Sequence, residues 1–123
     1  MSKNQTVVVL GASPKPERYS NQAVAMLKEY GYEVIPVNPS GVSIHDLNTE
    51  KSLDDIKMPV ETLTMYVGVK ISSTQQEAIL RLKPKRVIFN PGTENPELET
   101  ALENNGTEII HACTLVLLRT EQF

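Results

Sequence analysis

Short apolar runs alternate with helix-like patterns along most of this chain. The first run, Val7-Val8-Val9-Leu10, is continuous and rich in β-branched residues, which is typical of a strand buried on both faces of a parallel sheet. Further strands are predicted at residues 34–37, 62–67, 87–89 and 109–110. Pro36 lies inside the second strand and has no N–H to give, so this strand is expected at a sheet edge or to end there.

Helical spacing of apolar residues separates these strands. The first helix is expected to begin at the N-cap pair Ser20-Asn21 and to end at Gly31. Later helical segments are a turn at residues 53–56 capped by Ser52, a helix capped by Ser72 or Ser73 and stopped by Pro84, a helix from Asn95 to Asn104, and a short closing helix at residues 115–118. This alternation predicts an α/β fold, a Rossmann-like doubly wound parallel sheet with helices on both faces.

The composition suits one globular domain over residues 1–123, with 40% hydrophobic and 22% charged residues and no repeat or linker. The net charge of −3 argues against nucleic acid as a partner. A single cysteine excludes an intramolecular disulfide and the common zinc sites built on two or more cysteines, and no metal is expected. No apolar stretch approaches the roughly 18–20 residues of a membrane span. We therefore expect a soluble cytoplasmic protein that does not bind membranes.

Ligands of open parallel sheets bind outside the carboxyl ends of the strands. The segments at that edge are residues 11–21, 38–41, 68–73, 90–95 and 111–114, and several are rich in Gly, Ser, Asn and Pro. Such residues bring backbone amides close to a ligand or supply short hydrogen-bonding groups. The sequence therefore predicts a nucleotide-type site beside the first of these segments.

The first segment contains one glycine and two prolines, so it is not a G-x-G-x-x-G turn. One interpretation is that it wraps a phosphate chain at the N-terminus of the first helix, where free N–H groups favour anions. Ser13, Ser20 and Asn21 would donate hydrogen bonds, and Lys15 and Arg18 would neutralise phosphate charge. The alternative is an ordinary capped loop with two solvated cations.

The end of the second strand bears on the choice of nucleotide. NAD-binding domains place an acidic residue there to hold the ribose hydroxyls. This chain has Val37-Asn38-Pro39 instead, and the nearest acid, Glu33, lies at the other end of the strand. NAD is therefore a less favoured ligand.

Three weaker candidates follow from the remaining segments. A proline-glycine turn and an Asn N-cap explain residues 90–95 apart from Glu94, which would either act on a ligand or favour the start of the helix. His111 and Cys113 suggest a thiol nucleophile with a base, but a buried, inert cysteine is the more common case. His45 is expected to be a surface histidine.

Taken together, several segments resemble the small stand-alone coenzyme A-binding domain proteins. These are similar to the N-terminal coenzyme A-binding domain of the succinyl-CoA synthetase α subunit and of ADP-forming acyl-CoA synthetases. The resemblance rests on residues 8–13 with 14–21, residues 31–39, residues 90–95 and Cys113, in the family's order along nearly the whole chain. Departures lie at residues 40–45, at the start of the third strand and at Lys70-Ile71, where relatives often carry a proline.

The resemblance implies a five-stranded sheet of order 3-2-1-4-5 and a coenzyme A site. The diphosphate and adenosine would be flanked by Gly11, Ala12, Ser13, Lys15, Arg18, Tyr19, Ser20 and Asn21. Asn38 and Pro39 would lie near the adenine-ribose end, and Val67, Gly68 and Val69 would border the pantetheine path. The catalytic histidine of the synthetases belongs to a different domain, so the resemblance gives His111 no such role.

The leading hypothesis is a small non-catalytic protein that binds coenzyme A or an acyl-CoA for a binding or regulatory role. A chain of 123 residues is used up by the five strands and their helices, which leaves no substrate domain to close over a reacting centre. The alternatives are an NAD(P)-binding or other nucleotide-binding protein, a small thiol enzyme using Cys113 and His111, and an interaction subunit of an acyl-CoA synthetase. The oligomeric state stays open.

Overall fold

One parallel sheet forms the centre of the molecule. The computed structural model describes residues 5–123, so the first four residues of the expected domain lie outside the described part. Its five strands are β1 (Thr6–Leu10), β2 (Glu33–Val37), β3 (Thr62–Met65), β4 (Arg86–Phe89) and β5 (Glu108–His111). They pair in the order β2-β1-β3-β4-β5, all parallel. The predicted α/β, Rossmann-like doubly wound fold is confirmed.

The expected strand order 3-2-1-4-5 is wrong. It places the third strand beyond the second, whereas β3 pairs with β1 on the side opposite β2, from Val7↔Thr62 to Leu10↔Met65. In residues 5–123 the outer edge of β2 forms one isolated bridge, between Val37 and Glu50, in which the Glu50 N–H donates to the Pro36 carbonyl at 2.9 Å. The N–H and the carbonyl of a strand residue point to the same side. Because the Pro36 carbonyl faces the outer edge of the sheet, the N–H that Pro36 lacks would also have faced the outer edge. The missing donor disfavours a full strand along that edge, and β2 is an edge strand, which is one of the two alternatives that Pro36 predicted.

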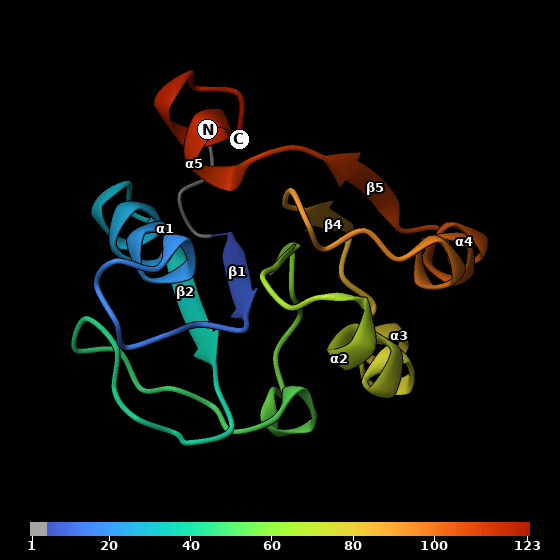
Figure 1. Ribbon diagram of the computed structural model, residues 1–123, viewed down its shortest axis with the longest axis horizontal. Helices are drawn as coiled ribbons and strands as arrows, with labels where there is room; N and C mark the ends of the chain where they lie inside the picture. The colour runs from blue at the N-terminus through green and yellow to red at the C-terminus, as the bar shows by residue number, and fades with distance from the viewer. Residues whose placement is uncertain (1–4) are drawn as a thin grey trace.

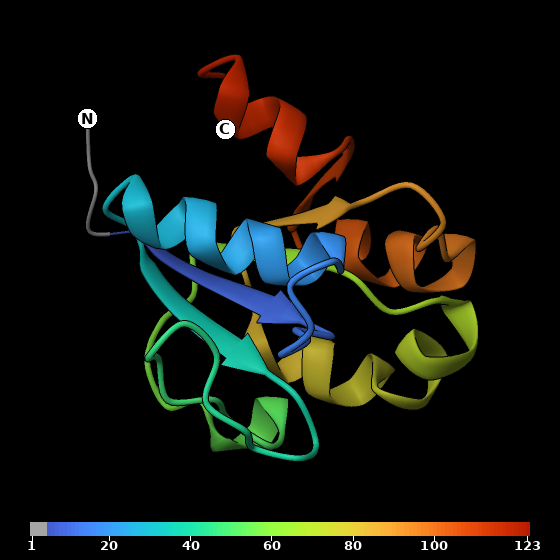
Figure 2. The same ribbon diagram turned by 60° about the vertical axis from the view of Figure 1, so that its left-hand side comes forward.

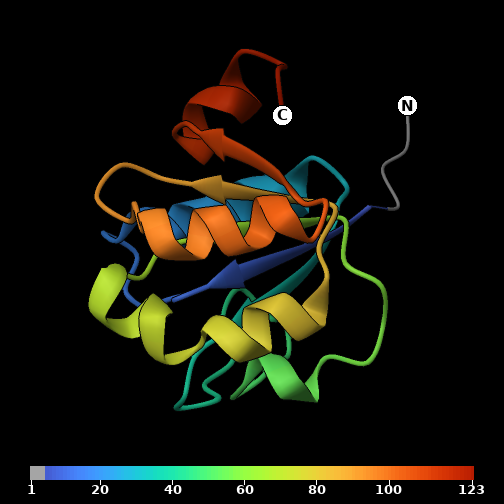
Figure 3. The same cartoon turned by 90° about the vertical axis from the view of Figure 1, so that its right-hand side faces the viewer.

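The two faces of the sheet are covered by different helices (Figures 1 and 3). Helices α1 (Tyr19–Glu29) and α5 (Thr114–Arg119) cover one face, and α3 (Gln76–Leu82) and α4 (Pro96–Asn104) cover the other, with α2 (Val69–Thr74) leading into α3. Alternation along β1 explains this arrangement, because successive side chains of a strand point to opposite faces. Val7 and Val9 pack in the cluster containing Leu27 of α1, whereas Val8 and Leu10 pack in the cluster containing Ile79 of α3.

Some predicted helix starts are correct. The Asn95 side chain accepts a hydrogen bond from the Leu98 N–H, and the Ser52 side chain accepts one from the Asp54 N–H at the single 3₁₀ turn η1 (Leu53–Asp55). These caps were predictable because donor and acceptor are two or three residues apart.

Two other predicted starts are wrong. Helix α1 begins one residue before Ser20, with Arg18 at its N-cap and no side-chain cap, because the Asn21 amide bonds to other segments. The helix expected after Ser72 or Ser73 is two helices, α2 and α3, and both serine hydroxyls accept hydrogen bonds from the amide of Asn95. In both cases a partner distant in the sequence uses the side chain.

All five strands point to one edge of the sheet. In Figure 2 the arrowheads of β1 and β2 run toward the loop that precedes α1, and Figure 3 shows the loop between β4 and α4 on that same side. The carboxyl ends of the strands therefore bring together segments that lie far apart in the chain.

Candidate functional site

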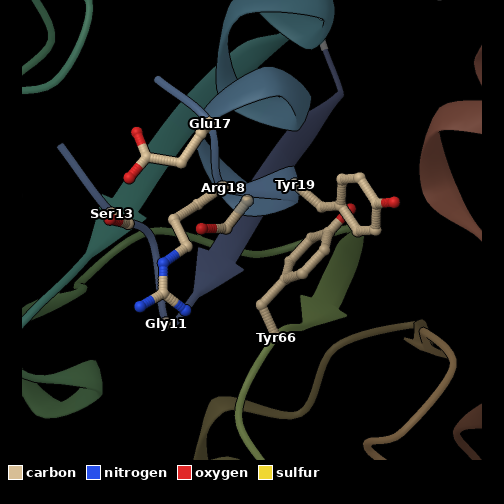
Figure 4. Close-up of a pocket in the computed structure, with 7 residues that line it drawn as sticks. Gly11, Ser13, Glu17, Arg18, Tyr19 and Tyr66 are labelled. Carbon is tan, nitrogen blue, oxygen red and sulfur yellow. The ribbon is translucent and has the colours of Figure 1, made fainter. Parts of the chain in front are cut away.

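An open cavity of about 410 Å³ lies at the carboxyl edge of the sheet (Figure 4). It is lined by Gly11, Ser13, Glu17, Arg18, Tyr19, Ser20 and Tyr66. The first six come from the loop after β1 and the start of α1, and Tyr66 directly follows β3. The cavity therefore lies beside the segment where the sequence predicts a ligand.

Two asparagine side chains hold the start of the loop. The Nδ2 amide of Asn38 donates to the carbonyl of Ala12 at 2.6 Å, and the Nδ2 amide of Asn21 donates to the carbonyl of Ser13 at 2.8 Å. The N–H groups of Gly11 and Ala12 both donate to the carbonyl of Val37 at 3.1 Å. The backbone amides of Gly11 and Ala12 are thus bonded to protein and are not directed at a ligand.

Further free donors lie at the N-terminus of α1. No side chain caps this helix, and within residues 5–123 the N–H groups of Tyr19, Ser20 and Asn21 have no hydrogen-bond acceptor. The guanidinium of Arg18 forms no ion pair with any described carboxylate. In Figure 4 this side chain extends toward Gly11. Helix N-terminal amides beside an unpaired guanidinium suit an anion such as a phosphate.

Two residues of the cavity wall were missed in the sequence analysis, Glu17 and Tyr66. The carboxylate of Glu17 points away from the Arg18 guanidinium in Figure 4, so it remains an acceptor for N–H or O–H groups of a ligand. Tyr66 carried a usable signal, because it stands where β3 ends, one residue before the predicted Val67 and Gly68.

The pKa of Tyr66 is raised to about 12, chiefly by burial. The Thr114 hydroxyl acts to lower this pKa, the Cys113 thiol to raise it and the Thr64 hydroxyl to lower it, each by less than burial does. The hydroxyl oxygen is buried and has no partner in hydrogen-bonding geometry among the described residues. Burial away from water disfavours the phenolate more than the neighbouring hydroxyls stabilise it. Tyr66 therefore faces the cavity as a neutral phenol at physiological pH.

Asn90 ties together the strand ends behind this cavity. Its Nδ2 amide donates to Thr64 Oγ1 at 2.8 Å and to the carbonyl of Met65 at 2.7 Å. Its Oδ1 accepts from the N–H of Thr114 at 2.8 Å, and the hydroxyls of Thr64 and Thr114 lie 2.7 Å apart. Asn90, Thr64 and Thr114 are all buried. The ends of β3 and β4 and the start of α5 are therefore joined by one satisfied network.

The remaining predicted site residues lie around the cavity rather than in its wall. Ala12 is buried, and Asn21 and Asn38 bond to the loop backbone. Val67 contacts Gly11, and Gly68 is the N-cap of α2. Lys15, Pro39 and Val69 are exposed and do not line the cavity. The structure therefore separates residues that shape the loop from residues that face its cavity.

The weaker candidates have partners of their own. Nε2 of His111 lies 2.8 Å from the Glu99 carboxylate, and its ring stacks obliquely on Phe89. Cys113 is half-buried at the N-cap of α5. The carboxylate of Glu94 accepts from the N–H of Gly92 within its own turn. In residues 5–123 no three His, Cys, Asp or Glu side chains are grouped to hold a metal ion.

A doubly wound parallel sheet with an uncapped helix N-terminus after β1 defines a Rossmann-like domain with a candidate ligand site at the carboxyl edge of the sheet. The model of the family described as the CoA binding domain matches residues 5–119. The chain belongs to this family. None of the helices in the described part of the chain is long and apolar enough to cross a membrane.

Three comparisons place this chain among known proteins. A crystal structure of an uncharacterized protein is 39% identical, with a TM-score of 0.92 over 99% of this chain and 100% of that chain. The uncharacterized protein YneT of Bacillus subtilis is 24% identical over 110 residues, which is 89% of this chain and 82% of YneT. The dinucleotide-forming acetyl-coenzyme A synthetase 1 of Ca. Korarchaeum cryptofilum shares the fold at 21% identity, with a TM-score of 0.75 over 89% of this chain and 26% of the synthetase.

Proposed function

We propose that this protein binds coenzyme A or an acyl-CoA at the cavity beside residues 11–21, as a small non-catalytic binding or regulatory protein. The observation that carries the proposal is the N-terminus of α1, where three free backbone N–H groups adjoin the unpaired guanidinium of Arg18. Membership of the CoA binding domain family supports coenzyme A as the ligand whose phosphate groups bind at this helix end.

The diphosphate would lie against the first turn of α1. The N–H groups of Tyr19, Ser20 and Asn21 would donate to its oxygens, and Arg18 would neutralise part of its charge. The hydroxyl of Ser13 accepts a hydrogen bond from the Lys15 N–H at 3.1 Å and still has its own proton to donate. The exposed side chain of Lys15 is free to turn toward a bound phosphate.

The two arms of the ligand would leave the diphosphate in opposite directions. We assign the pantetheine arm to the side of Val67, Gly68 and Val69, because Val67 packs directly against Gly11 and Val69 is 48% exposed. The adenosine would lie toward Asn38 and Pro39. Both polar atoms of the Asn38 side chain are engaged, by the Ala12 carbonyl and by the Ser40 N–H at 2.8 Å, so Asn38 would shape this end rather than contact the ligand.

This arrangement favours coenzyme A over NAD(P). A ribose-binding carboxylate at the end of β2 would hold NAD, but Asn38 stands there with its amide committed to the loop. The thiol-enzyme alternative gains no support, because within residues 5–123 no hydrogen bond joins the thiol of Cys113 to the imidazole of His111. A cytoplasmic location belongs to the proposal as well. A lack of nucleic-acid binding is also part of it, and the net charge of −3 supports that part.

The decisive experiment is a titration with coenzyme A, followed by calorimetry and by the melting temperature. Coenzyme A should raise the melting temperature, and adenosine should raise it less, because a ligand that binds only the native state stabilises it. NADP should not displace coenzyme A. No heat and no shift at millimolar coenzyme A would contradict the proposal.

A further inference from the structure

A tight turn at residues 44–47 is held against α1. Ile44 and Leu47 exchange two backbone hydrogen bonds of 3.2 and 2.9 Å, and the residues between them, His45 and Asp46, have φ values of 50° and 65°. This is the left-handed region, which few residues other than glycine adopt, although Asn, Asp and His do so most often. The side chain of Ile44 is buried, and the Lys28 ammonium donates to the His45 carbonyl at 2.7 Å.

The turn directs the His45 side chain at the start of α1. Nε2 of His45 lies 2.7 Å from Oδ1 of Asn21, and Nδ2 of Asn21 donates to the Ser13 carbonyl at 2.8 Å. Because the amide nitrogen is used by a carbonyl, Oδ1 is the acceptor, and Nε2 of His45 must carry the proton. A chain of two hydrogen bonds therefore joins this turn to residues 11–21, which we call the ligand loop.

We propose that His45 is a positioning residue for the ligand loop, which it holds through Asn21. With Asn21 fixed, the Ser13 carbonyl stays bonded to protein beside the cavity. A freed carbonyl oxygen there would repel a phosphate, and a mobile loop would have to be ordered on binding. The consequence for affinity rests on the proposed coenzyme A function, whereas the ordering of the loop does not.

Two substitutions separate the hydrogen bond from the turn. His45→Asn retains a residue that tolerates the left-handed conformation, but its amide ends near the place of Nδ1 and cannot reach Asn21. His45→Gln places an amide nitrogen near the position of Nε2 and retains the donor. Both replacements are uncharged and polar, so a difference between them reports on the bond to Asn21.

The first readout is amide hydrogen exchange in the unliganded protein, measured by NMR. The N–H groups of Lys15 and Arg18 are bonded within the loop, to Ser13 Oγ and to the Lys15 carbonyl. His45→Asn should speed exchange at both amides, and His45→Gln should restore the wild-type rates. The second readout is the dissociation constant for coenzyme A, which should rise about three- to tenfold in His45→Asn, the usual worth of one hydrogen bond.

The outcomes are distinguishable. If the wild-type protein does not bind coenzyme A, the proposed function fails, and the exchange rates alone decide the role of His45. Unchanged exchange in His45→Asn, or equal effects of both substitutions, would overturn the inference. A double-mutant cycle adds a further check, because His45→Asn should have no extra effect in an Asn21→Ala background, and additive effects would refute the link.

Discussion

Gly11 and Val67 lie in direct contact at the carboxyl edge of the sheet. A β-carbon on Gly11 would fall 2.7 Å from Cγ1 of Val67 and 3.0 Å from the carbonyl carbon and oxygen of Tyr66. The loop after β1 therefore packs against the segment after β3 with no room for a side chain. This contact brings Tyr66 into the wall of the cavity that the first loop forms.

Gly11→Ala should destabilise the protein by about 3 kcal/mol, since it combines left-handed strain with overpacking. Gly92→Ala is the matched control, because Gly92 has the same φ of 90° but nothing within 4 Å of its added β-carbon. It should cost about 1 kcal/mol, from strain alone. Urea unfolding measures both values, and equal losses would show that the contact with Val67 is not restrictive.

Asn90→Ala should destabilise the protein by at least about 3 kcal/mol. The change leaves the Met65 carbonyl, the Thr114 N–H and the Thr64 hydroxyl without this partner, and unsatisfied buried groups cost about 1–3 kcal/mol each. Asn104→Ala, at an exposed position of α4, should leave stability nearly unchanged. The denaturant midpoints of the two variants provide the comparison. If Asn90→Ala unfolds at the same denaturant concentration as the wild type, the hydrogen bonds of Asn90 do not stabilise the fold.

Stability should fall between about pH 10 and pH 12 because of Tyr66. Its pKa is raised from 10.0 to about 12 in the folded protein, so the unfolded chain loses the phenolic proton first as the pH rises. The stabilisation is complete below pH 10.0 and is lost through about pH 12, by about 2–3 kcal/mol. Unfolding free energies of wild type and Tyr66→Phe, measured across this range, should diverge only there. Parallel curves would show that Tyr66 is not desolvated.

Arg18→Gln should weaken coenzyme A binding about tenfold, because a charge-assisted bond to a phosphate is lost. Lys85→Gln removes the same charge at the amino edge of the sheet, where Lys85 is exposed and pairs with Glu61 at 3.5 Å. It should change the dissociation constant by less than about twofold. Calorimetry at two salt concentrations measures the dissociation constant of both variants. Equal losses of affinity would show that Arg18 acts only through the net charge of the protein and not through a direct bond to the phosphate.

Features that depend on near neighbours were predictable from the chain alone. The run at residues 7–10, the helix patterns and the caps at Ser52 and Asn95 define the α/β class and the element order. Pro36 marked an edge strand because its missing N–H is a property of the residue itself. The position of the cavity beside residues 11–21 follows as well, since parallel strands present their carboxyl ends at one edge.

Features that depend on distant partners needed the folded chain. The place of β3 beside β1 is decided by the outer edge of β2, where Glu50 makes only one bridge. Asn21 and Asn38 look like ligand donors in the sequence, yet the structure commits both amides to the loop's own carbonyls. Tyr66 joins the cavity through the close packing of its segment on Gly11. Local patterns determine which elements form, whereas pairing and side-chain partners are chosen among all segments that folding brings together.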